Sequence, residues 1–135
     1  MGKCDPGLNE HRTLVVTSAH TAVALGSGDV DVLGTPALLA LAEAACVEAI
    51  APDLPDGETS VGVWAEIEHL KASPLGATVC AHATLIGHHK RRLEFSVVVE
   101  QDGEPVARIR HRRILVDRER FLEGIAQRAA AVPAS

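Results

Sequence analysis

Two side chains in this sequence have the chemistry of an acid–base pair, and the first is Glu43. At helical spacing Glu43 shares a face with Leu39, Val47 and Ile50, so a carboxylate interrupts an apolar stripe. A carboxylate buried without a partner costs several kcal/mol or becomes protonated. Glu43 therefore requires a partner or a water-filled pocket, unless it is an exposed acid on a partly solvated side of the helix.

The second member of the predicted pair is His69. At strand spacing it shares one face with Val61, Val63, Ala65 and Ile67, and the other face carries Gly62, Trp64, Glu66 and Glu68. This alternation predicts that His69 points toward the core side, where the helix would lie. Alone, such a histidine is a satisfied core residue; beside a buried acid, each of the two explains the other.

Thr35 and Gly62 are the remaining candidates. Thr35 precedes Pro36, which predicts Thr35 as a helix N-cap with proline at the first helical position. A helix end also offers free N–H groups and a positive dipole to an oxyanion or a thioester carbonyl. Thr35 and Glu43 are about 12 Å apart along a helix, so a relay through His69 is stretched in one chain and relaxed across a dimer interface. A glycine within a strand, such as Gly62, marks either a bulge or the close approach of a ligand.

Alternating patterns and turn residues indicate the elements that position these side chains. One apolar helix is predicted over Ala37–Ala51, ended by the segment PDLPDGE, and an amphipathic helix over Arg118–Ala131. Residues 1–12 are expected to be a flexible tail, and residues 26–31 a mobile turn. Strands are predicted at Thr13–Ser18, Thr59–Leu70, Ala77–Gly87, Arg91–Gln101 and Glu104–Val116.

One strand, a buried helix and then four strands joined by short turns is an α+β order. We therefore predict a single domain over residues 1–135, in which a curved antiparallel sheet wraps around the helix. Such a sheet leaves an open edge, and pairing two edges in a homodimer would cover it.

Composition excludes several other classes of protein. The net charge of −5 argues against a nucleic-acid partner. No hydrophobic run approaches the ~20 residues of a membrane span, and the N-terminus has no apolar signal core, so we expect a cytoplasmic protein without a membrane partner. The three cysteines share no C-x-x-C spacing and no H-x-x-x-H pair lies on the helix, so neither a disulfide framework nor a metal or other cofactor is expected.

Charge is unevenly distributed along the chain. Residues 87–135 hold 10 of the 13 Lys and Arg residues, among them Lys90, Arg91 and Arg92 in a predicted turn. These cations would suit the phosphates of a CoA nucleotide, or they are a solvated surface. Among the other histidines, His82 is expected to be half exposed, and His88 and His89 lie in the same turn.

Three segments together resemble the fluoroacetyl-CoA thioesterase family of the hot-dog superfamily. The similarity runs from about Val32 to Phe121 and is carried by GTPALLALAEAAC (34–46), VGVWAEIEH (61–69) and RHRRILVDRERF (110–121). Glu43 follows Thr35 by eight residues, and His69 follows Glu43 by 26.

The resemblance implies a dimer with one continuous sheet and active sites at the interface, hydrolysing a small-molecule acyl-CoA. It implies catalytic roles for Thr35, Glu43 and His69. Glu43 would activate water or attack the thioester, His69 would be the acid–base partner, and Thr35 would orient the carbonyl. Substrate contacts are assigned to Gly62, through its backbone, and to Ala37 and Leu38.

The sequence leaves the acyl group of the substrate undetermined, and it leaves two alternative functions open. The segment ALGSGDVDVL (24–33) contains no Phe, whereas the fluoroacetyl-specific member has an aromatic lid before the helix, so the acyl group is left open. A non-catalytic module that binds acyl thioesters or another small molecule, and a hot-dog dehydratase, are the alternatives to a thioesterase. The spacing of Glu43 and His69 favours the thioesterase.

Overall fold

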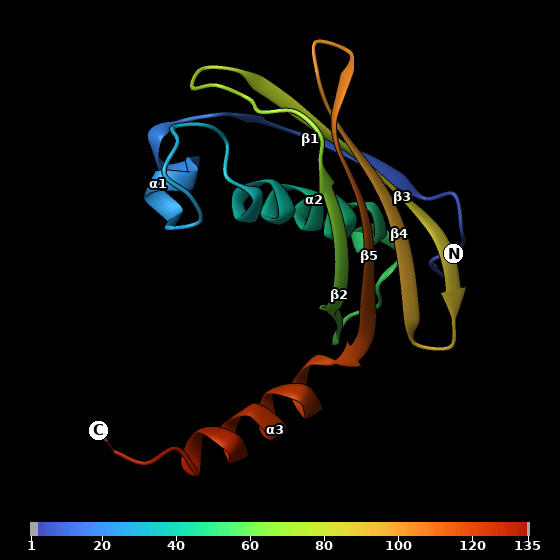
Figure 1. Ribbon diagram of the computed structural model, residues 1–135. Coiled ribbons are helices and arrows are strands. Elements are labelled where there is room, and N and C mark those ends of the chain that lie inside the picture. Colours follow the sequence, from blue (N-terminus) through green and yellow to red (C-terminus); the bar gives the residue numbers. More distant parts are fainter. Residues whose placement is uncertain (1–2, 135) are drawn as a thin grey trace.

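Five strands form one antiparallel sheet around a central helix in the computed structural model, which describes residues 3–134 (Figure 1). The strand order is β1-β3-β4-β5-β2, so β1 and β2 are the two edges. The strands are β1 (Asn9–Val15), β2 (Glu58–His69), β3 (Thr78–His89), β4 (Arg92–Gln101) and β5 (Glu104–Asp117). The predicted α+β class and the four strands after the helix are confirmed within one or two residues at each end.

Short turns connect the last three strands, and residues in these turns adopt the left-handed backbone conformation that tight hairpins require. Asp102 and Gly103 have φ of 53° and 78°, which suits a two-residue hairpin turn between β4 and β5. Lys90, with φ of 57°, turns the chain between β3 and β4. These tight hairpins place β3, β4 and β5 side by side and fix their register.

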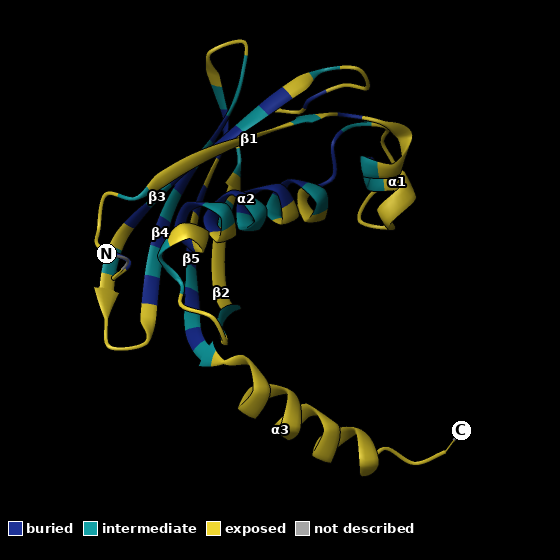
Figure 2. Ribbon diagram, turned by 180° about the vertical axis from the view of Figure 1, so that it is seen from behind, coloured by how far each residue is buried: buried dark blue, intermediate teal, exposed yellow. Residues whose placement is uncertain are grey.

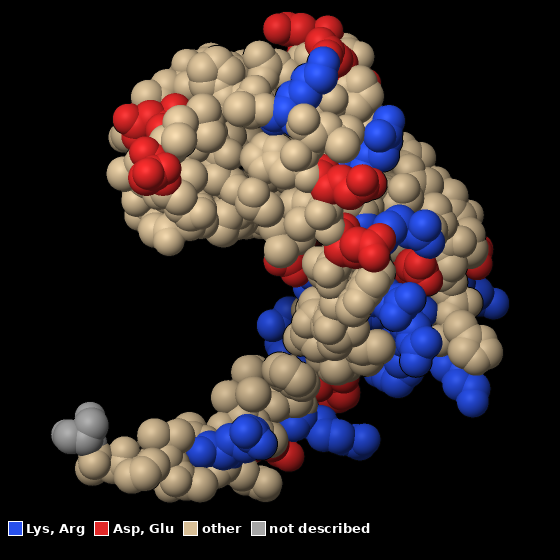
Figure 3. Space-filling model, in the orientation of Figure 1, with Lys and Arg blue, Asp and Glu red and all other residues tan. Residues whose placement is uncertain are grey.

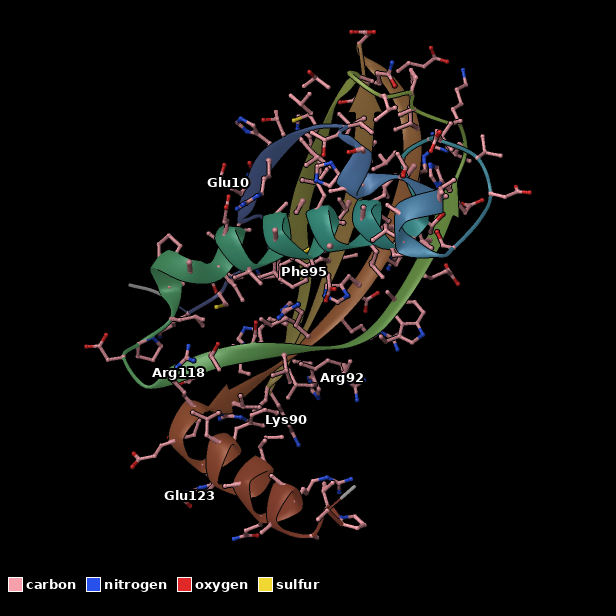
Figure 4. All side chains as sticks on the ribbon, turned by 90° about the vertical axis from the view of Figure 1, so that its left-hand side faces the viewer. Glu10, Lys90, Arg92, Phe95, Arg118 and Glu123 are labelled. Carbon is pink, nitrogen blue, oxygen red and sulfur yellow. The ribbon has the colours of Figure 1, made fainter. Side chains whose placement is uncertain are left out.

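Helix α2 (Thr35–Ile50) lies along the concave side of the sheet (Figures 1 and 2). Leu38, Ala42 and Cys46 are fully buried, and Phe95 of β4 lies beside α2 in Figure 4. The side of α2 away from the sheet is partly open, with Val47 exposed. The predicted enclosure of the helix is therefore incomplete in the single chain.

The helix region does not fit the expectation that no apolar run in this sequence approaches the length of a membrane span. Residues Thr35–Asp53, including a 3-10 turn at Ala51–Asp53, are long and apolar enough by length and composition to cross a membrane. Packing of α2 against β1 and β3 accounts for this composition, since a core helix needs apolar residues on the faces that the sheet covers.

The N-terminal segment differs from the expected flexible tail. Strand β1 begins at Asn9, where the sequence pattern had predicted loose chain to residue 12, and pairs with β3 from Asn9↔Thr84 to Val15↔Thr78. Backbone hydrogen bonds do not depend on apolar side chains, so a polar segment joins the sheet edge. Cys4 is buried, while Met1 and Gly2 lie outside the described residues.

The segment before α2 contains a short helix that the sequence did not predict. Helix α1 (Ala22–Leu25) is capped by the Thr21 hydroxyl, which accepts from the Ala24 amide at 3.2 Å, and it ends at Gly26 with φ of 69°. Gly34 packs on α1, because a Cβ at Gly34 would lie 3.1 Å from the Ala22 nitrogen. Residues 26–31, predicted as a turn, follow α1 as an irregular exposed loop.

Helix α3 (Arg118–Ala130) confirms the predicted C-terminal helix and points away from the sheet (Figures 1 and 2). The Asp117 carboxylate caps it by accepting from the Arg120 amide at 2.9 Å. None of its residues is buried, and Phe121, Leu122 and Ile125 are exposed apolar side chains. In this single chain α3 contributes nothing to the core.

Candidate functional site

Thr35 and His69 meet at the open end of α2. The Thr35 Oγ1 atom lies 2.9 Å from His69 Nδ1, and both residues line a cavity of about 300 Å³ with Leu33, Gly34 and Leu70. His69 Nε2 is buried and has no hydrogen-bond partner among residues 3–134. Burial lowers the pKa of His69 below its usual range, and the backbone of Lys71, which favours the protonated ring, partly opposes this shift. A neutral imidazole at this position is suited to accept or donate a proton.

The role predicted for Thr35 in the helix was wrong in one respect. Gly34, in extended conformation, is the N-cap, and no side chain caps the first amides of α2. Thr35 is the first helical residue, and its hydroxyl bonds to His69 rather than to the helix backbone. The hydroxyl therefore faces His69 without a capping role, and the catalytic role of Thr35 stays a prediction.

Glu43 lies two turns further along α2 and contacts a different pair of side chains. Its Oε2 is 3.2 Å from Arg113 Nη1 and 3.3 Å from His111 Nε2, both on β5. The Glu43 side chain is 39% exposed, whereas His111 and Arg113 are buried. The carboxylate thus has the partner that the sequence required of it, on the partly open side of the helix.

Gly62 lies directly beneath the Glu43 carboxylate. A Cβ at Gly62 would lie 2.6 Å from Glu43 Oε2 and 3.0 Å from the His111 ring, closer than real Cβ contacts. The register of β2 against β5 also shifts between Gly62 and Trp64, so a bulge is present as well. The bulge confirms one of the two predicted explanations for this glycine, while the approach of a ligand stays a prediction. The close approach that the structure shows is that of the Glu43 side chain.

The bulge also changes which residues of β2 face inward. Val61 was predicted on the core face with His69, but it pairs with the half-buried Ile114, while Gly62 pairs with the buried Arg113. Val63, the extra residue of the bulge, is 54% exposed. One extra residue reverses the alternation on one side of the bulge. Ile67 and His69, beyond it, are partly buried as predicted.

No hydrogen bond or ion pair joins Glu43 to His69 in the described part of the chain. The sequence had indicated that a relay of Thr35, His69 and Glu43 would be stretched within one chain. The structure instead has two groups: Thr35 with His69, and Glu43 with Arg113, His111 and Gly62.

Sequence reasoning did not identify His111 and Arg113. Their signal was present in β5, where Ala107, Ile109, His111, Arg113 and Leu115 alternate with exposed or half-buried residues and are all buried. A histidine and an arginine that interrupt an apolar strand face need polar partners, and an acid such as Glu43 is a suitable partner for the arginine. Strand spacing applied to RHRR would have found both.

The substrate assignment of Leu38 is not retained. Leu38 is fully buried in the core and its amide donates to the Gly34 carbonyl at 3.1 Å, so neither side chain nor amide faces the cavity. Ala37 is partly buried against the same core. The first turn of α2 uses these residues for packing.

Residues outside the site behave as surface groups. His82 is exposed and its Nε2 lies 3.2 Å from a Glu100 carboxylate oxygen. Lys and Arg side chains gather over β4, β5 and the start of α3 (Figure 3), where Arg91 and Arg120 line a cavity of about 650 Å³ with Phe121. Lys90, Arg92 and Arg118 surround this region in Figure 4.

Comparisons with known proteins agree on one family. The sequence profile of the family described as "Fluoroacetyl-CoA-specific thioesterase" matches residues 16–119. The fluoroacetyl-CoA thioesterase of Streptantibioticus cattleyicolor is 33% identical over 101 residues, which cover 75% of this chain and 73% of that protein.

Solved structures give the same result for the fold. A structure of the fluoroacetyl-CoA thioesterase has a TM-score of 0.86 at 28% identity, covering 96% of this chain and 98% of the other. A hot-dog-like protein from Thermanaerovibrio acidaminovorans has a TM-score of 0.84 at 24% identity, covering 91% of each chain. A thioesterase superfamily member from Thermus thermophilus has 0.86 at 21%, covering 98% and 100%, and shows the fold alone. The fold is the hot-dog fold.

Proposed function

From the premise that the chain belongs to the fluoroacetyl-CoA-specific thioesterase family and is a thioester hydrolase, we propose that it hydrolyses an acyl-CoA as a homodimer. The catalytic residues of this proposal are Glu43, Thr35 and His69. The observation that carries the proposal is the Glu43 carboxylate, which Arg113 and His111 hold directly over a glycine. The glycine leaves room for the carboxylate, and the 39% exposure of the Glu43 side chain leaves that carboxylate accessible to a substrate.

The substrate class rests on relatives. Structures of the fluoroacetyl-CoA thioesterase include a complex with acetyl-CoA and one with fluoroacetate and CoA. We do not extend fluoroacetyl selectivity to this chain, because residues 24–33 contain no Phe for an aromatic lid. A short-chain acyl-CoA is the class of substrate that we propose, and its acyl group is a matter for assay.

Each group has a step in hydrolysis. The Glu43 carboxylate removes a proton from water as the water oxygen attacks the thioester carbonyl, or attacks that carbon itself to form an anhydride that water then opens. The Thr35 hydroxyl and the neutral His69 imidazole orient the carbonyl. The proton released by the water passes to the departing thiolate through His69, which accepts it on one ring nitrogen before donating one, so that the Glu43 carboxylate and the neutral imidazole are both regenerated. The products are a carboxylic acid and CoA thiol.

The dimer supplies what the single chain lacks. Strand β2 is a free sheet edge, and antiparallel pairing with the β2 of a second copy directs each His69 end toward the Glu58 end of the other strand. That half of β2 carries Gly62, beneath Glu43. In the dimer, His69 of one copy would therefore lie closer to Glu43 of the other copy than to the Glu43 of its own chain.

A panel of acyl-CoA thioesters with detection of free thiol tests the proposal. We expect hydrolysis of at least one short-chain member, and a loss of kcat of about 100-fold or more in Glu43→Gln, the scale of general acid–base catalysis. Glu48→Gln is the matched control, because Glu48 is on the same helix, has a similarly half-exposed side chain and is paired with Arg12 outside the site. Failure to hydrolyse short, branched or aromatic thioesters, or full activity in Glu43→Gln, would contradict the proposal.

A further inference from the structure

His111 is a buried histidine in contact with the proposed catalytic acid, and the mechanism above gives it no step. It lies in the middle of β5 with 2% of its surface exposed. The Phe95 ring of β4 stacks against it with centroids 6.4 Å apart. Its Nδ1 is 2.8 Å from the Trp64 carbonyl oxygen of β2.

These contacts determine which ring nitrogen carries hydrogen. A carbonyl oxygen only accepts, so Nδ1 of His111 is the donor and, in the neutral ring, Nε2 is an acceptor. Nε2 is 3.0 Å from Arg113 Nη1, which always donates. The neutral imidazole therefore receives a hydrogen bond from Arg113 and donates one to Trp64.

Arg113 has every nitrogen engaged in this arrangement. Its Nε donates to Ser60 Oγ at 2.8 Å and its Nη2 to the Ser60 carbonyl at 3.1 Å. The two hydrogens of Nη1 are left for His111 Nε2 at 3.0 Å and Glu43 Oε2 at 3.2 Å. His111 thus accepts one of the two hydrogens of Arg113 Nη1, and Glu43 accepts the other.

We propose that His111 is a positioning residue for Glu43: as a neutral Nδ1–H tautomer that donates to the Trp64 carbonyl, it accepts from Arg113 and so aims the guanidinium at the Glu43 carboxylate beside Gly62. The proposal rests on the function proposed for Glu43. It predicts that Nε2 of His111 serves as an acceptor and that its protonation disables Glu43.

Protonation of His111 would change the arrangement directly. An imidazolium Nε2–H would face Arg113 as donor against donor and would turn to Glu43 Oε2, 3.3 Å away, occupying a lone pair that the reaction needs. Burial lowers the pKa of His111, the Arg113 charge adds to this, and the Trp64 carbonyl and Glu43 oppose it. The neighbouring Cys46 thiol is uncharged, because burial raises its pKa to about 12.

The pKa direction sets the expected pH dependence. Because the pKa of His111 is lowered from 6.5, the neutral ring predominates at neutral pH and kcat should fall only on the acid side of that value. His111→Gln retains an acceptor that does not titrate, whereas His111→Phe offers Arg113 no acceptor. We expect kcat for the Gln variant within about fivefold of wild type with its acid limb moved to lower pH. The Phe variant should lose about 10- to 100-fold in kcat, the scale of a misplaced catalytic group.

His82→Gln is the matched control. His82 also contacts a glutamate, Glu100 at 3.2 Å, but lies exposed on β3 outside the site, so its substitution should alter neither kcat nor the pH profile. Thermal melting of each variant establishes that it is folded. A folded His111→Phe variant with wild-type kcat and pH profile would overturn the proposal.

A second measurement does not depend on activity. Nitrogen-15 NMR of the imidazole rings in the wild-type protein at pH 7.5 should show His111 protonated on Nδ1 alone. An Nε2–H tautomer or an imidazolium would overturn the proposal even if every variant folds poorly. If wild type hydrolyses no thioester, the proposed function fails, while the tautomer still decides what His111 does for Arg113 and Glu43.

Discussion

Thr35 shows how a residue singled out in the sequence can have a different local role from the one predicted for it. Thr35 was predicted both as an N-cap and as a catalytic group, and Gly34 takes the capping position instead. The Thr35 hydroxyl is 2.9 Å from a neutral His69, whose pKa burial lowers. At the scale of single residues, the site uses a hydroxyl that the helix does not need.

This difference yields a prediction for Thr35→Ala. Because the hydroxyl does not cap α2, its loss should change the free energy of unfolding by less than the ~1 kcal/mol of a lost N-cap. The kcat should nevertheless fall by about 100-fold, as when a positioned donor is removed. Urea unfolding and steady-state kinetics measure the two effects, with Thr35→Ser as the variant that retains the hydroxyl. A large loss of stability with unchanged kcat would show that Thr35 is a structural residue.

At the scale of elements, β2 and β5 build the site together. Buried residues at every second position of β5 include His111 and Arg113, and the bulge in β2 brings Gly62 against the Glu43 carboxylate. Helix α2 then needs only one acid, at the right turn, to complete the cluster. Residues of α2, β2 and β5 thus together hold the Glu43 carboxylate in a partly buried position.

Gly62→Ala tests the contribution of the bulged strand. The added Cβ would lie 2.6 Å from Glu43 Oε2, so the carboxylate must move and kcat should fall by about 10- to 100-fold. Gly87→Ala is the matched control, since a Cβ at this second strand glycine lies 3.8 Å from Glu94, an ordinary contact. Equal kcat values for the two variants, both folded by thermal melting, would remove Gly62 from the site.

At the scale of the whole molecule, the single chain is open on one side. Within residues 3–134 the outer edge of β2 pairs with no strand, Val63 is 54% exposed and α3 extends away with exposed Phe121 and Leu122 (Figure 1). Thr35 and His69 are separate from Glu43 within this chain. An open edge beside a divided site is the arrangement expected of one half of a dimer.

Oligomeric state and activity should therefore change together. We expect the wild-type protein to sediment at twice the 14.2 kDa chain mass. Val63→Glu, which places like charges near the centre of paired β2 strands, should give monomers with little activity. Val132→Glu, 70% exposed beyond α3, should remain an active dimer. A wild-type monomer with full activity would refute the shared site.

Much of the architecture was determined by the sequence alone. Alternation, turn residues and the apolar run predicted the α2 helix, four of the strands and α3, because these depend on neighbours along the chain. The family also followed from three local strings. Strand β1 was partly missed because its polar residues join the sheet through backbone hydrogen bonds.

Only the tertiary structure decided which charged groups meet. Glu43 and Arg113 are 70 residues apart, and nothing along the chain relates them until β5 packs across from α2. The sequence indicated that Glu43 needed a partner, since an isolated buried carboxylate is unstable, but it pointed to His69. The partners are Arg113 and His111, because a β-bulge at Gly62 and the register of β5 set the distances that determine electrostatic pairing.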